Sequence, residues 1–356
     1  MKKLDHYIIK KFFSTFFFCI SLILIIVIVF DISEKIDDFL EHEITKKEII
    51  NYYIDFTPYF ANLFSHLFVF ISVIFFTSRM ANNSEIIAIQ NSGMSFIRFL
   101  RPFILTSLII FFLSFTLGNF IIPESNNRRI DFENKYLNKK KSSRAKDIHI
   151  QISQGNYIYM QSFNKKRKIG YKFTLEKFNN GKLVSKIKSD YIIYDSINQN
   201  WEINNYKIRE FKNDHEILKE GKKLEISLNL QPEELDNSTN LTETMNYFEL
   251  NKFIKNEKLK GSKNITYYEL EKYKRIAYPF ASIILTLIGV CISSKKTKKI
   301  GFHLGIGVIL AFAYIMFMQV STTFAINSNL SANIATWIPN IIFSVLACIL
   351  VLRISK

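Results

Sequence analysis

Cysteine is scarce in this sequence, with three residues in 356, at positions 19, 291 and 348. All three lie in long apolar stretches, so the large hydrophilic region between positions 123 and 275 contains none. That region is therefore not a disulfide-bonded extracellular scaffold, and it must be held together by an apolar core. At roughly 150 residues it is long enough to form one.

The motifs of common enzyme classes are also missing. The chain has no Gly-x-x-x-x-Gly-Lys-Ser/Thr phosphate loop, so it cannot hydrolyse ATP through that motif. Its six histidines show no metal-ligand spacing with one another or with cysteine, and there is no Gly-x-Ser-x-Gly nucleophile elbow. These absences favour a protein that is not an enzyme and that holds no cofactor or metal.

Apolar residues, by contrast, are abundant and come in runs. About 20 helical residues, rising 1.5 Å each, span the ~30 Å hydrocarbon core of a bilayer. Six stretches reach this length, at approximately 12–30, 54–76, 102–122, 276–292, 302–324 and 334–352. The first lacks a small-residue cleavage site and is predicted to be an uncleaved anchor. The sequence thus predicts an α-helical polytopic membrane protein, with three spans on each side of one hydrophilic domain.

Basic residues beside the short loops predict the orientation of these spans. They all fall on one side, at Lys2, Lys3, Lys10, Lys11, Arg79, Arg98, Arg101, Lys295, Lys296, Lys298, Lys299, Arg353 and Lys356. The opposite loop, 31–55, is mostly acidic. Both termini are therefore predicted in the cytoplasm and the large domain outside.

The formal net charge of +16 divides unevenly among these regions. The cytoplasmic segments carry +11, the acidic loop −5 and residues 123–275 +10. Much of the positive balance is therefore a topology signal, and it does not indicate nucleic-acid binding. The excess on the outer domain is compatible with an anionic partner, but lysines placed on any exposed surface are the simpler explanation.

The hydrophilic region predicts a β-rich domain. After a charged, helix-compatible segment at 124–146, short alternating runs occupy 149–152, 156–160, 171–175, 183–187, 191–194, 201–203, 206–208 and 224–228. Seven or eight such strands, separated by turn residues, are typical of an antiparallel sandwich, jelly roll or open barrel. A polar linker at 231–243 and helical patterns at 247–259 and 267–275 follow. The predicted organisation is 1–122 with three spans, 123–275 with the β-rich domain and its flanking helices, and 276–356 with three spans.

The loop between the second and third stretches predicts a short cytoplasmic helix at about 84–92. Asn83 or Ser84 is placed to cap it, Glu85 suits the positive end of the helix dipole, and Gly93 suits a left-handed stop. Two interpretations stay open: an interfacial helix that rests on lipid headgroups, and a coupling helix that docks into a cytosolic ATPase. Ile86 and Ile89 share one face of this helix, and in the second interpretation Glu85, Arg79 and Arg98 make charged contacts with the ATPase.

A polar stripe follows one face of the second stretch, at Asp55, Asn62, Ser65, His66 and Ser72. Polar groups at membrane depth avoid lipid, so this face should look into a protein interface or a wet cavity. Hydrogen bonding between helices is the simpler interpretation. In the fifth stretch, Gln319, Thr322 and Thr323 are candidates to line the same cavity, and Gly301, Gly305 and Gly307 are spaced for close helix approach.

Four motifs together resemble one family. They are Leu-Asp-His-Tyr-Ile at 4–8, Ser-Glu-Ile-Ile-Ala-Ile-Gln-Asn-Ser-Gly at 84–93, Gly-Asn-Phe-Ile-Ile-Pro at 118–123 and Tyr-Glu-Leu-Glu-Lys-Tyr-Lys-Arg-Ile-Ala-Tyr-Pro at 268–279. They look like the lipopolysaccharide export permeases LptF and LptG, and closer to LptG. The resemblance covers essentially the whole chain.

This resemblance implies a permease subunit of an ATP-driven exporter of the ABC type in the bacterial inner membrane. Such a subunit pairs with a second LptF/LptG-type permease and with a dimer of an LptB-like ATPase, which binds the ATP. It extracts lipopolysaccharide and passes it through a periplasmic jelly roll to LptC-like and LptA-like proteins. By the same resemblance, the first and fifth spans would form a lateral gate.

The resemblance also assigns candidate residues to three sites. Those for ATPase coupling are Arg79, Glu85, Ile86, Ile89, Gly93 and Arg98, and those for the substrate cavity are Lys35, Asn62, His66, Gln319 and Thr322. Those for an acyl-chain groove are Tyr157, Tyr159 and Phe173, for which packing in the core of the domain is the simpler role. One departure concerns the first span. Some LptG proteins carry a lysine in its outer part for lipopolysaccharide phosphates, whereas residues 25–30 here are Ile-Ile-Val-Ile-Val-Phe and the nearest cation is Lys35.

Other classes stay open. A secondary transporter would need ionisable groups at the midplane or interrupted helices in both halves. A membrane enzyme would need a catalytic cluster near one interface, and Asp55, His66 and His303 do not converge in the predicted topology. A permease of the same architecture for another amphipathic lipid would differ only in cargo.

Overall fold

The computed structural model describes residues 3–137, 144–164, 167–196, 198–212, 215–228, 230, 232–235, 239–259, 261–262, 264–295, 300–328 and 330–355. The chain divides into two compact units. The helical unit comprises Met1–Leu137, Thr242–Leu250 and Thr266–Lys356, and the sheet unit comprises Asn138–Leu241 and Asn251–Ile265. Most of the predicted basic loop at 295–299 lies outside the described residues.

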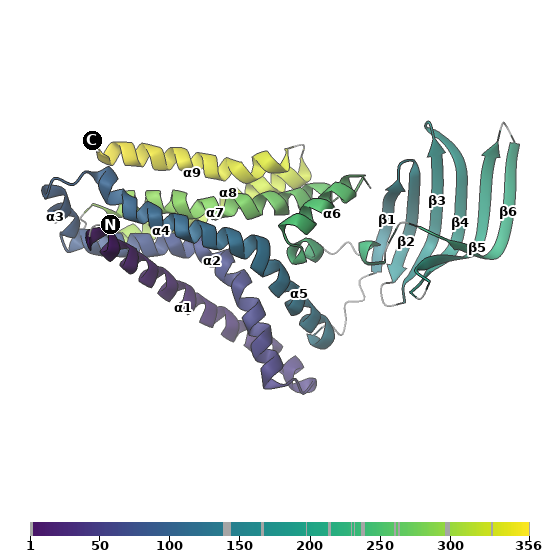
Figure 1. Cartoon of the computed structure of the whole chain (residues 1–356), viewed down its shortest axis with the longest axis horizontal. Helices are drawn as coiled ribbons and strands as arrows, with labels where there is room; N and C mark the ends of the chain where they lie inside the picture. The colour runs from purple at the N-terminus through teal and green to yellow at the C-terminus, as the bar shows by residue number, and fades with distance from the viewer. Residues whose placement is uncertain are drawn as a thin grey trace. The chain divides into compact units, whose positions relative to one another are not determined.

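Long helices build the helical unit (Figure 1). In chain order they are α1 (Lys3–Glu41), α2 (Lys46–Asn82), α3 (Glu85–Asn91), α4 (Phe96–Thr116), the π-helical turn η1 (Leu117–Ile121), α5 (Ile122–Phe132), the π-helical turn η2 (Glu133–Leu137), α7 (Ile265–Ser293), α8 (Ile300–Asn327) and α9 (Ala332–Ser355). Among the described residues, six helices are long and apolar enough to cross a membrane, with α4, η1, α5 and η2 forming one of them. The prediction of six spans, three on each side of a β domain, is confirmed.

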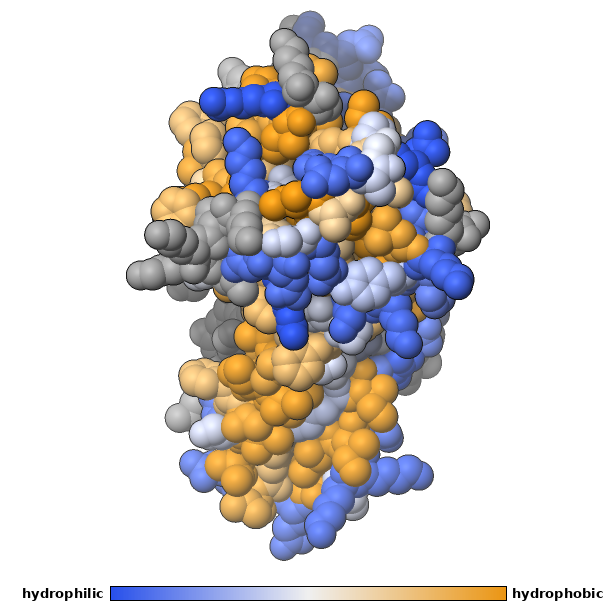
Figure 2. Space-filling model, turned by 90° about the vertical axis from the view of Figure 1, so that its left-hand side faces the viewer, coloured by the Kyte–Doolittle hydropathy of each residue, from blue (hydrophilic) through white to orange (hydrophobic). Residues whose placement is uncertain are grey.

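The spans differ in how much of their surface other helices cover. In the most apolar window of α7, 67% of the residues are buried, against 17% in that of α1 and 28% in that of the span containing α8. Figure 2 looks onto the end that carries α3 and both termini in Figure 1, and it shows hydrophilic side chains beside large apolar areas, the widest of them in the lower half of the view. A polytopic membrane protein has such a surface because lipid, not water, covers its apolar side chains. We call this the α3 end, and the opposite end, where α4 runs into η1, the η1 end.

Two glycines bring α2 close to its neighbours. A Cβ on Gly307 of α8 would lie 2.2 Å from Ile74 Cδ1, and one on Gly289 of α7 would lie 3.0 Å from Val73 Cγ1. Of the glycines predicted to allow close helix approach at the start of the fifth span, Gly307 makes such a contact. Gly305 does not, because a Cβ there would meet no described atom within 4 Å. Close packing without side chains between the backbones is typical of helix pairs in membranes.

The sheet unit contains one antiparallel sheet of six described strands (Figure 1). They are β1 (Arg144–Ser153), β2 (Asn156–Asn164), β3 (Ile169–Asn179), β4 (Lys182–Asp195), β5 (Asn200–Lys212) and β6 (His215–Ile226), and each pairs with the next in sequence order. The all-β prediction is confirmed, and the described strands form a meander in a single sheet. Short 3-10 turns, η3 (Pro232–Leu235) and η4 (Thr239–Thr244), and helix α6 (Tyr247–Leu259) follow the sheet.

A line of backbone irregularities crosses the sheet and explains why the sequence predicts more strands than the six that the structure describes. Between β3 and β4, Tyr171 pairs with Tyr191 and Phe173 with Ser189, whereas Lys172 and Asp190 between them form no pair. Corresponding gaps interrupt the other four pairings, and Asp147, Lys172 and Asn205 on this line have φ of 52°. We call this line the crease.

At the crease the side-chain alternation slips by one residue. On β4, Ile187 and Ser189 are buried before it, and Ile192 and Tyr194 after it, so both halves of the strand keep their apolar side on the same face. Without the irregularity, a continuous period of two would turn one half outward. The predicted strands at 183–187 and 191–194 are therefore one strand, β4, and those at 201–203 and 206–208 are both in β5.

Candidate functional site

Helix α3 has the predicted position and the predicted glycine after its end, but no side chain caps its first turn. Ser84 is at the N-cap position with φ of 60°, and its side chain makes no capping hydrogen bond. Asn83 Nδ2 instead donates to Glu85 Oε1 at 3.2 Å. Gly93 has φ of 80°, the left-handed conformation predicted for the residue that ends the helix.

The two isoleucines predicted on one face of α3 point into the protein. Ile86 is 1% exposed and belongs to an apolar cluster with Ile8 and Phe99, against which Ile89 also packs. Ile87, which is 44% exposed, lies on the outer side. Ile86 and Ile89 therefore anchor α3 to the helical unit, and the surface available to a partner is formed by other residues.

Two polar contacts tie the start of α1 to this region. Arg98 donates to both carboxylate oxygens of Asp5, at 2.8 and 2.7 Å, in a bidentate pair between α4 and α1. The Tyr7 hydroxyl donates to Glu85 Oε2 at 3.3 Å. Arg79 is exposed near the end of α2. Of the predicted charged contacts, Arg98 is thus already paired within the chain.

The polar stripe of α2 faces other helices of the same unit. Ser114 of α4 donates its hydroxyl to Asn62 Oδ1 at 2.6 Å, and Ser65 Oγ lies 3.2 Å from His66 Nδ1. Towards the η1 end, Asp55 Oδ1 accepts hydrogen bonds from Arg128 Nε and Nη2 at 2.8 and 2.6 Å. The bonds to Asn62 and Asp55 are the interhelical hydrogen bonds of the simpler interpretation, whereas Ser65 and His66 contact each other within α2. Among the described residues, Ser72 Oγ has no hydrogen-bond partner.

The residues predicted to complete the substrate cavity lie elsewhere. Gln319 is exposed on α8, and the Thr322 hydroxyl donates to its own helix, at the carbonyl of Met318. Lys35 Nζ contacts Asp31 Oδ1 at 2.8 Å and the Tyr52 hydroxyl at 2.5 Å. The structure does not bring these three residues together with Asn62 and His66, because each is engaged locally or faces outward.

A cavity of about 280 Å³ does adjoin the stripe, near the η1 end. It is enclosed by parts of α2, α4, η1, α5, η4 and α7, and its lining residues are Tyr59, Asn62, Leu63, Ser114, Gly118, Ile122, Asn126, Glu243, Tyr267, Glu271, Lys274, Arg275, Tyr278 and Pro279. Burial, followed by the nearby Glu271 carboxylate, raises the pKa of Glu243. We call this space the η1 cavity.

One side of the η1 cavity is held by Arg275. Its Nη1 donates to the carbonyl of Met245 at 2.7 Å, its Nη2 to the carbonyl of Thr242 at 2.6 Å, and its Nε to Glu271 Oε1 at 3.3 Å. The guanidinium thus joins α7 to η4 and to the residues just after it. Sequence reasoning placed no site here, because Glu243 and Lys274 lie in different predicted segments and share no motif.

Of the three residues predicted for the groove, only Phe173 lies on the apolar face of the sheet. Phe173 is fully buried in its apolar cluster, together with Trp201 and Ile203. Tyr157 and Tyr159, two residues apart, lie on the opposite face from Ile158, which belongs to that cluster. The two tyrosines are therefore not on the apolar face.

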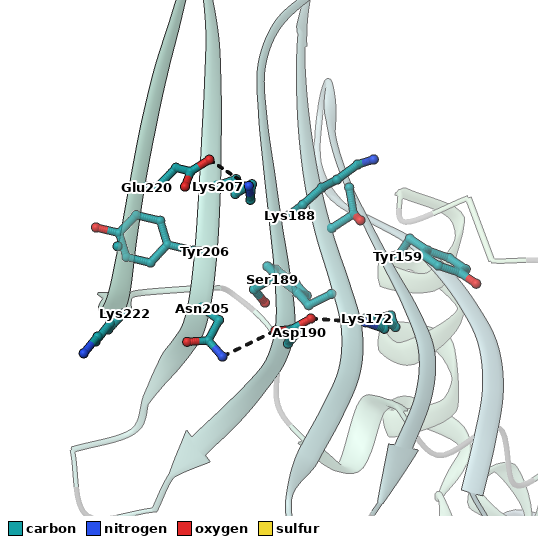
Figure 3. A pocket seen from close by; sticks show the side chains of 13 residues that line it. Tyr159, Lys172, Lys188, Ser189, Asp190, Asn205, Tyr206, Lys207, Glu220 and Lys222 are labelled. Carbon is teal, nitrogen blue, oxygen red and sulfur yellow. Dashed lines mark hydrogen bonds and ion pairs between the residues drawn. The ribbon is translucent and has the colours of Figure 1, made fainter.

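The opposite, polar face carries an open pocket of about 660 Å³ along the crease (Figure 3). Asp190 is bonded on both sides, by Lys172 Nζ at 3.1 Å and by Asn205 Nδ2 at 3.4 Å. The hydrogen bond from Lys172, then that from Asn205, lowers the pKa of Asp190. This row stabilises the crease by linking three neighbouring strands.

Neither the η1 cavity nor the pocket along the crease has the ligands of a metal centre. Within the described part of the chain, no group of three or more His, Cys, Asp or Glu side chains is placed to hold a metal ion.

Comparison with known proteins gives one family. The model of the lipopolysaccharide export system permease LptF/LptG family matches residues 6–353. No curated protein matches the chain. The match covers all six spans and the sheet, which is nearly the whole chain.

Proposed function

The chain belongs to the lipopolysaccharide export system permease LptF/LptG family, and from this premise we propose that it is the permease subunit of an ATP-driven exporter. In this proposal the chain binds no ATP, and a separate LptB-like ATPase dimer supplies the energy. The single observation that carries the proposal is the family match from residue 6 to residue 353. One family model describes both LptF and LptG, so the LptG-like assignment stays a prediction.

The protein spans the membrane several times, and we place it in the bacterial inner membrane with both termini in the cytoplasm. Supporting this orientation, the termini and α3 share one end of the helical unit (Figure 1), and the basic residues of the short loops belong to that end. The η1 end would then face the periplasm, together with the sheet unit.

Helix α3 is the proposed contact with the ATPase. Its outer side presents Ile87, Ala88 and Gln90, all exposed, while Ile86 anchors it to the cluster that contains residues of α1, α2 and α4. A displacement of α3 would reach α1 through Tyr7 and Glu85. The Asp5–Arg98 pair would make α1 and α4 move together, because a bidentate ion pair fixes both distance and angle.

The outward faces of α1 and α8 are the proposed contact with a second LptF/LptG-type permease. Large apolar side chains are exposed along both helices, at Phe17, Phe18, Leu22, Ile25, Ile26, Val29 and Phe30 on α1 and at Val308, Ile309, Phe312, Ile315, Met316 and Val320 on α8. If these sides of α1 and α8 faced the corresponding helices of the second permease, lipopolysaccharide would enter between the two subunits from the side. The apolar face of the sheet would then receive the acyl chains on their way to LptC-like and LptA-like proteins.

Co-purification tests the coupling part of this proposal. The tagged chain, expressed in its native membrane and extracted in mild detergent, is expected to recover an ATPase subunit, a second permease and lipopolysaccharide, identified by mass spectrometry. Glu85→Arg should lose the ATPase and retain the second permease. A matched charge reversal at the other end, Glu124→Arg, should retain both.

Repeated recovery of the wild-type chain without any ATPase, under conditions that preserve a known ABC complex, would contradict the exporter proposal. Loss of the ATPase in both variants would place the effect of Glu85→Arg in the fold and not in α3.

A further inference from the structure

The η1 cavity contains three polar groups that the protein itself does not satisfy. Asn126 of α5 is 0% exposed, and its Oδ1 accepts no hydrogen bond from any described residue, although its Nδ2 donates to the backbone oxygen of Glu243 at 3.3 Å. With respect to the residues the structure describes, neither the Glu243 carboxylate nor Lys274 Nζ makes a hydrogen bond or an ion pair. A buried acceptor without a donor is costly, and more so where lipid replaces water.

These groups differ in charge, which limits what could bind. The cavity offers one carboxylate and one amide oxygen as acceptors and one ammonium as a donor, while Glu271 and Arg275 are paired with each other. A divalent cation would be repelled by Lys274 and Arg275, and a simple anion by Glu243 and Glu271. A ligand that carries a positive and a negative group a few bonds apart would match both sides.

The cavity also has an apolar border. Leu63 lines it and is 45% exposed on the outside of α2, within a helix that crosses the membrane. Ile122 lies in the wall, and three tyrosines, Tyr59, Tyr267 and Tyr278, complete it. A molecule can therefore place a polar group among the charges and leave apolar chains along the lipid-facing side of α2.

The volume and position suit a headgroup. About 280 Å³ is several times the ~30 Å³ that one water occupies in the liquid, and it is close to the lower end of small-ligand pockets, roughly 300 Å³. The lining segments are the first half of α2, the end of α4 and the first half of α7, which all lie towards the η1 end. Lipid headgroups lie at the ends of spans and not at their middle.

We propose that the η1 cavity binds the headgroup of a bilayer phospholipid that carries a phosphate and a primary ammonium. The ammonium donates hydrogen bonds to the Glu243 carboxylate and to Asn126 Oδ1, and the phosphate accepts one from Lys274 Nζ. A quaternary ammonium has no N–H to give to Asn126, so an ethanolamine headgroup is preferred over choline. The proposal does not depend on the ATPase or on the exported lipid.

Native mass spectrometry of the full chain tests this site. The protein, stripped of lipid by detergent exchange, is titrated separately with phosphatidylethanolamine, phosphatidylcholine and phosphatidylglycerol of identical acyl chains. The wild type should retain phosphatidylethanolamine about tenfold better than either of the others. Lys274→Gln should weaken retention of all three lipids, and Glu243→Gln should bring phosphatidylethanolamine down to the level of phosphatidylglycerol.

Controls separate the site from the fold. Lys272→Gln lies two residues away on α7, where its side chain stacks over Tyr273 at 5.4 Å and does not line the cavity; it should bind as the wild type does. Glu34→Gln, exposed on α1, is the matched control for Glu243. Leu63→Trp keeps every charged group and should lower retention by narrowing the lipid-facing border.

Three results would overturn the proposal. They are equal retention of the three phospholipids by the wild type, unchanged selectivity in Lys274→Gln and Glu243→Gln, and displacement of phosphatidylethanolamine by lipopolysaccharide with the same dependence on Lys274 and Glu243. The last would assign the cavity to the exported lipid.

Discussion

Ile86→Ala is the substitution that best separates the anchoring of α3 from its contact with a partner. Ile86 is 1% exposed within an apolar cluster, and α3 has seven residues, too few to be stable as an isolated helix. Truncation of a buried isoleucine costs about 2–5 kcal/mol. We take ~3 kcal/mol, because α3 lies at the edge of the cluster and the site can partly collapse.

The expected result is local opening of α3. Since each 1.4 kcal/mol is a factor of ten, ~3 kcal/mol raises the open population roughly 100-fold. Hydrogen exchange measured by mass spectrometry on the full chain in detergent should show this acceleration in the peptide that contains α3, and not in the sheet.

Ile87→Ala is the matched control, because Ile87 is 44% exposed on the same helix. It should leave the exchange of α3 within about twofold of the wild type, since exposed substitutions change stability by ~0.5 kcal/mol or less. It should nevertheless reduce ATPase recovery if the outer side of α3 is the contact. Equal exchange rates in the two variants would refute the assignment of Ile86 as the anchor.

Three further predictions concern the sheet and the helix packing. Trp201→Phe removes the hydrogen bond that the indole Nε1 donates to the carbonyl of Leu230 at 2.9 Å. It should lower the unfolding free energy of the sheet by ~1–3 kcal/mol, measured by urea unfolding. An unchanged unfolding free energy would contradict this prediction. The pKa of Asp190 lies below its ordinary value of 3.8 because Lys172 donates a hydrogen bond to its carboxylate. The carboxylate therefore stabilises the sheet above pH 3.8, and this contribution is lost as the pH falls through the lowered pKa. Asp190→Asn should flatten this acid dependence in thermal melts, and identical pH profiles of wild type and variant would refute the prediction. Gly307→Leu should lower the melting temperature, because overpacking α8 against α2 costs ~1–3 kcal/mol of stability. Gly305→Leu should leave the melting temperature unchanged, because a Cβ at Gly305 would have open space around it. Equal shifts in the two variants would contradict the close approach of α8 to α2.

The spans and the β character could be predicted from the sequence because each depends on a local pattern. A helix in lipid must satisfy its own backbone, so any sufficiently long apolar run predicts one. The crease could be recognised only in part. Its signal in the sequence is the slip of the apolar alternation between Ser189 and Ile192 and between Ile203 and Tyr206. The same slip is also typical of a gap between two separate strands, so the sequence alone does not distinguish the two.

The candidate site was less accessible to sequence reasoning. Arg98 was predicted to face an ATPase, but it pairs with Asp5, 93 positions away. Ile86 and Ile89 were placed together on one face, as they are, although the period of a helix does not tell whether that face is inside or outside. Tyr157 and Tyr159 were predicted for an apolar groove because aromatic residues suit one, whereas strand register places them on the polar face.

The sequence by itself determined the number of spans, their division by a β-rich domain, the position of α3 and the family, because hydropathy and short motifs are properties of adjacent residues. Only the tertiary structure decided that the six strands pair in order and are bent along one crease. It also decided that Asn62 and Asp55 of the α2 stripe are hydrogen-bonded by other helices, and that Asn126, Glu243 and Lys274 meet in one cavity. Those contacts join residues far apart in the chain, and packing selects them from many partners that the sequence would equally allow.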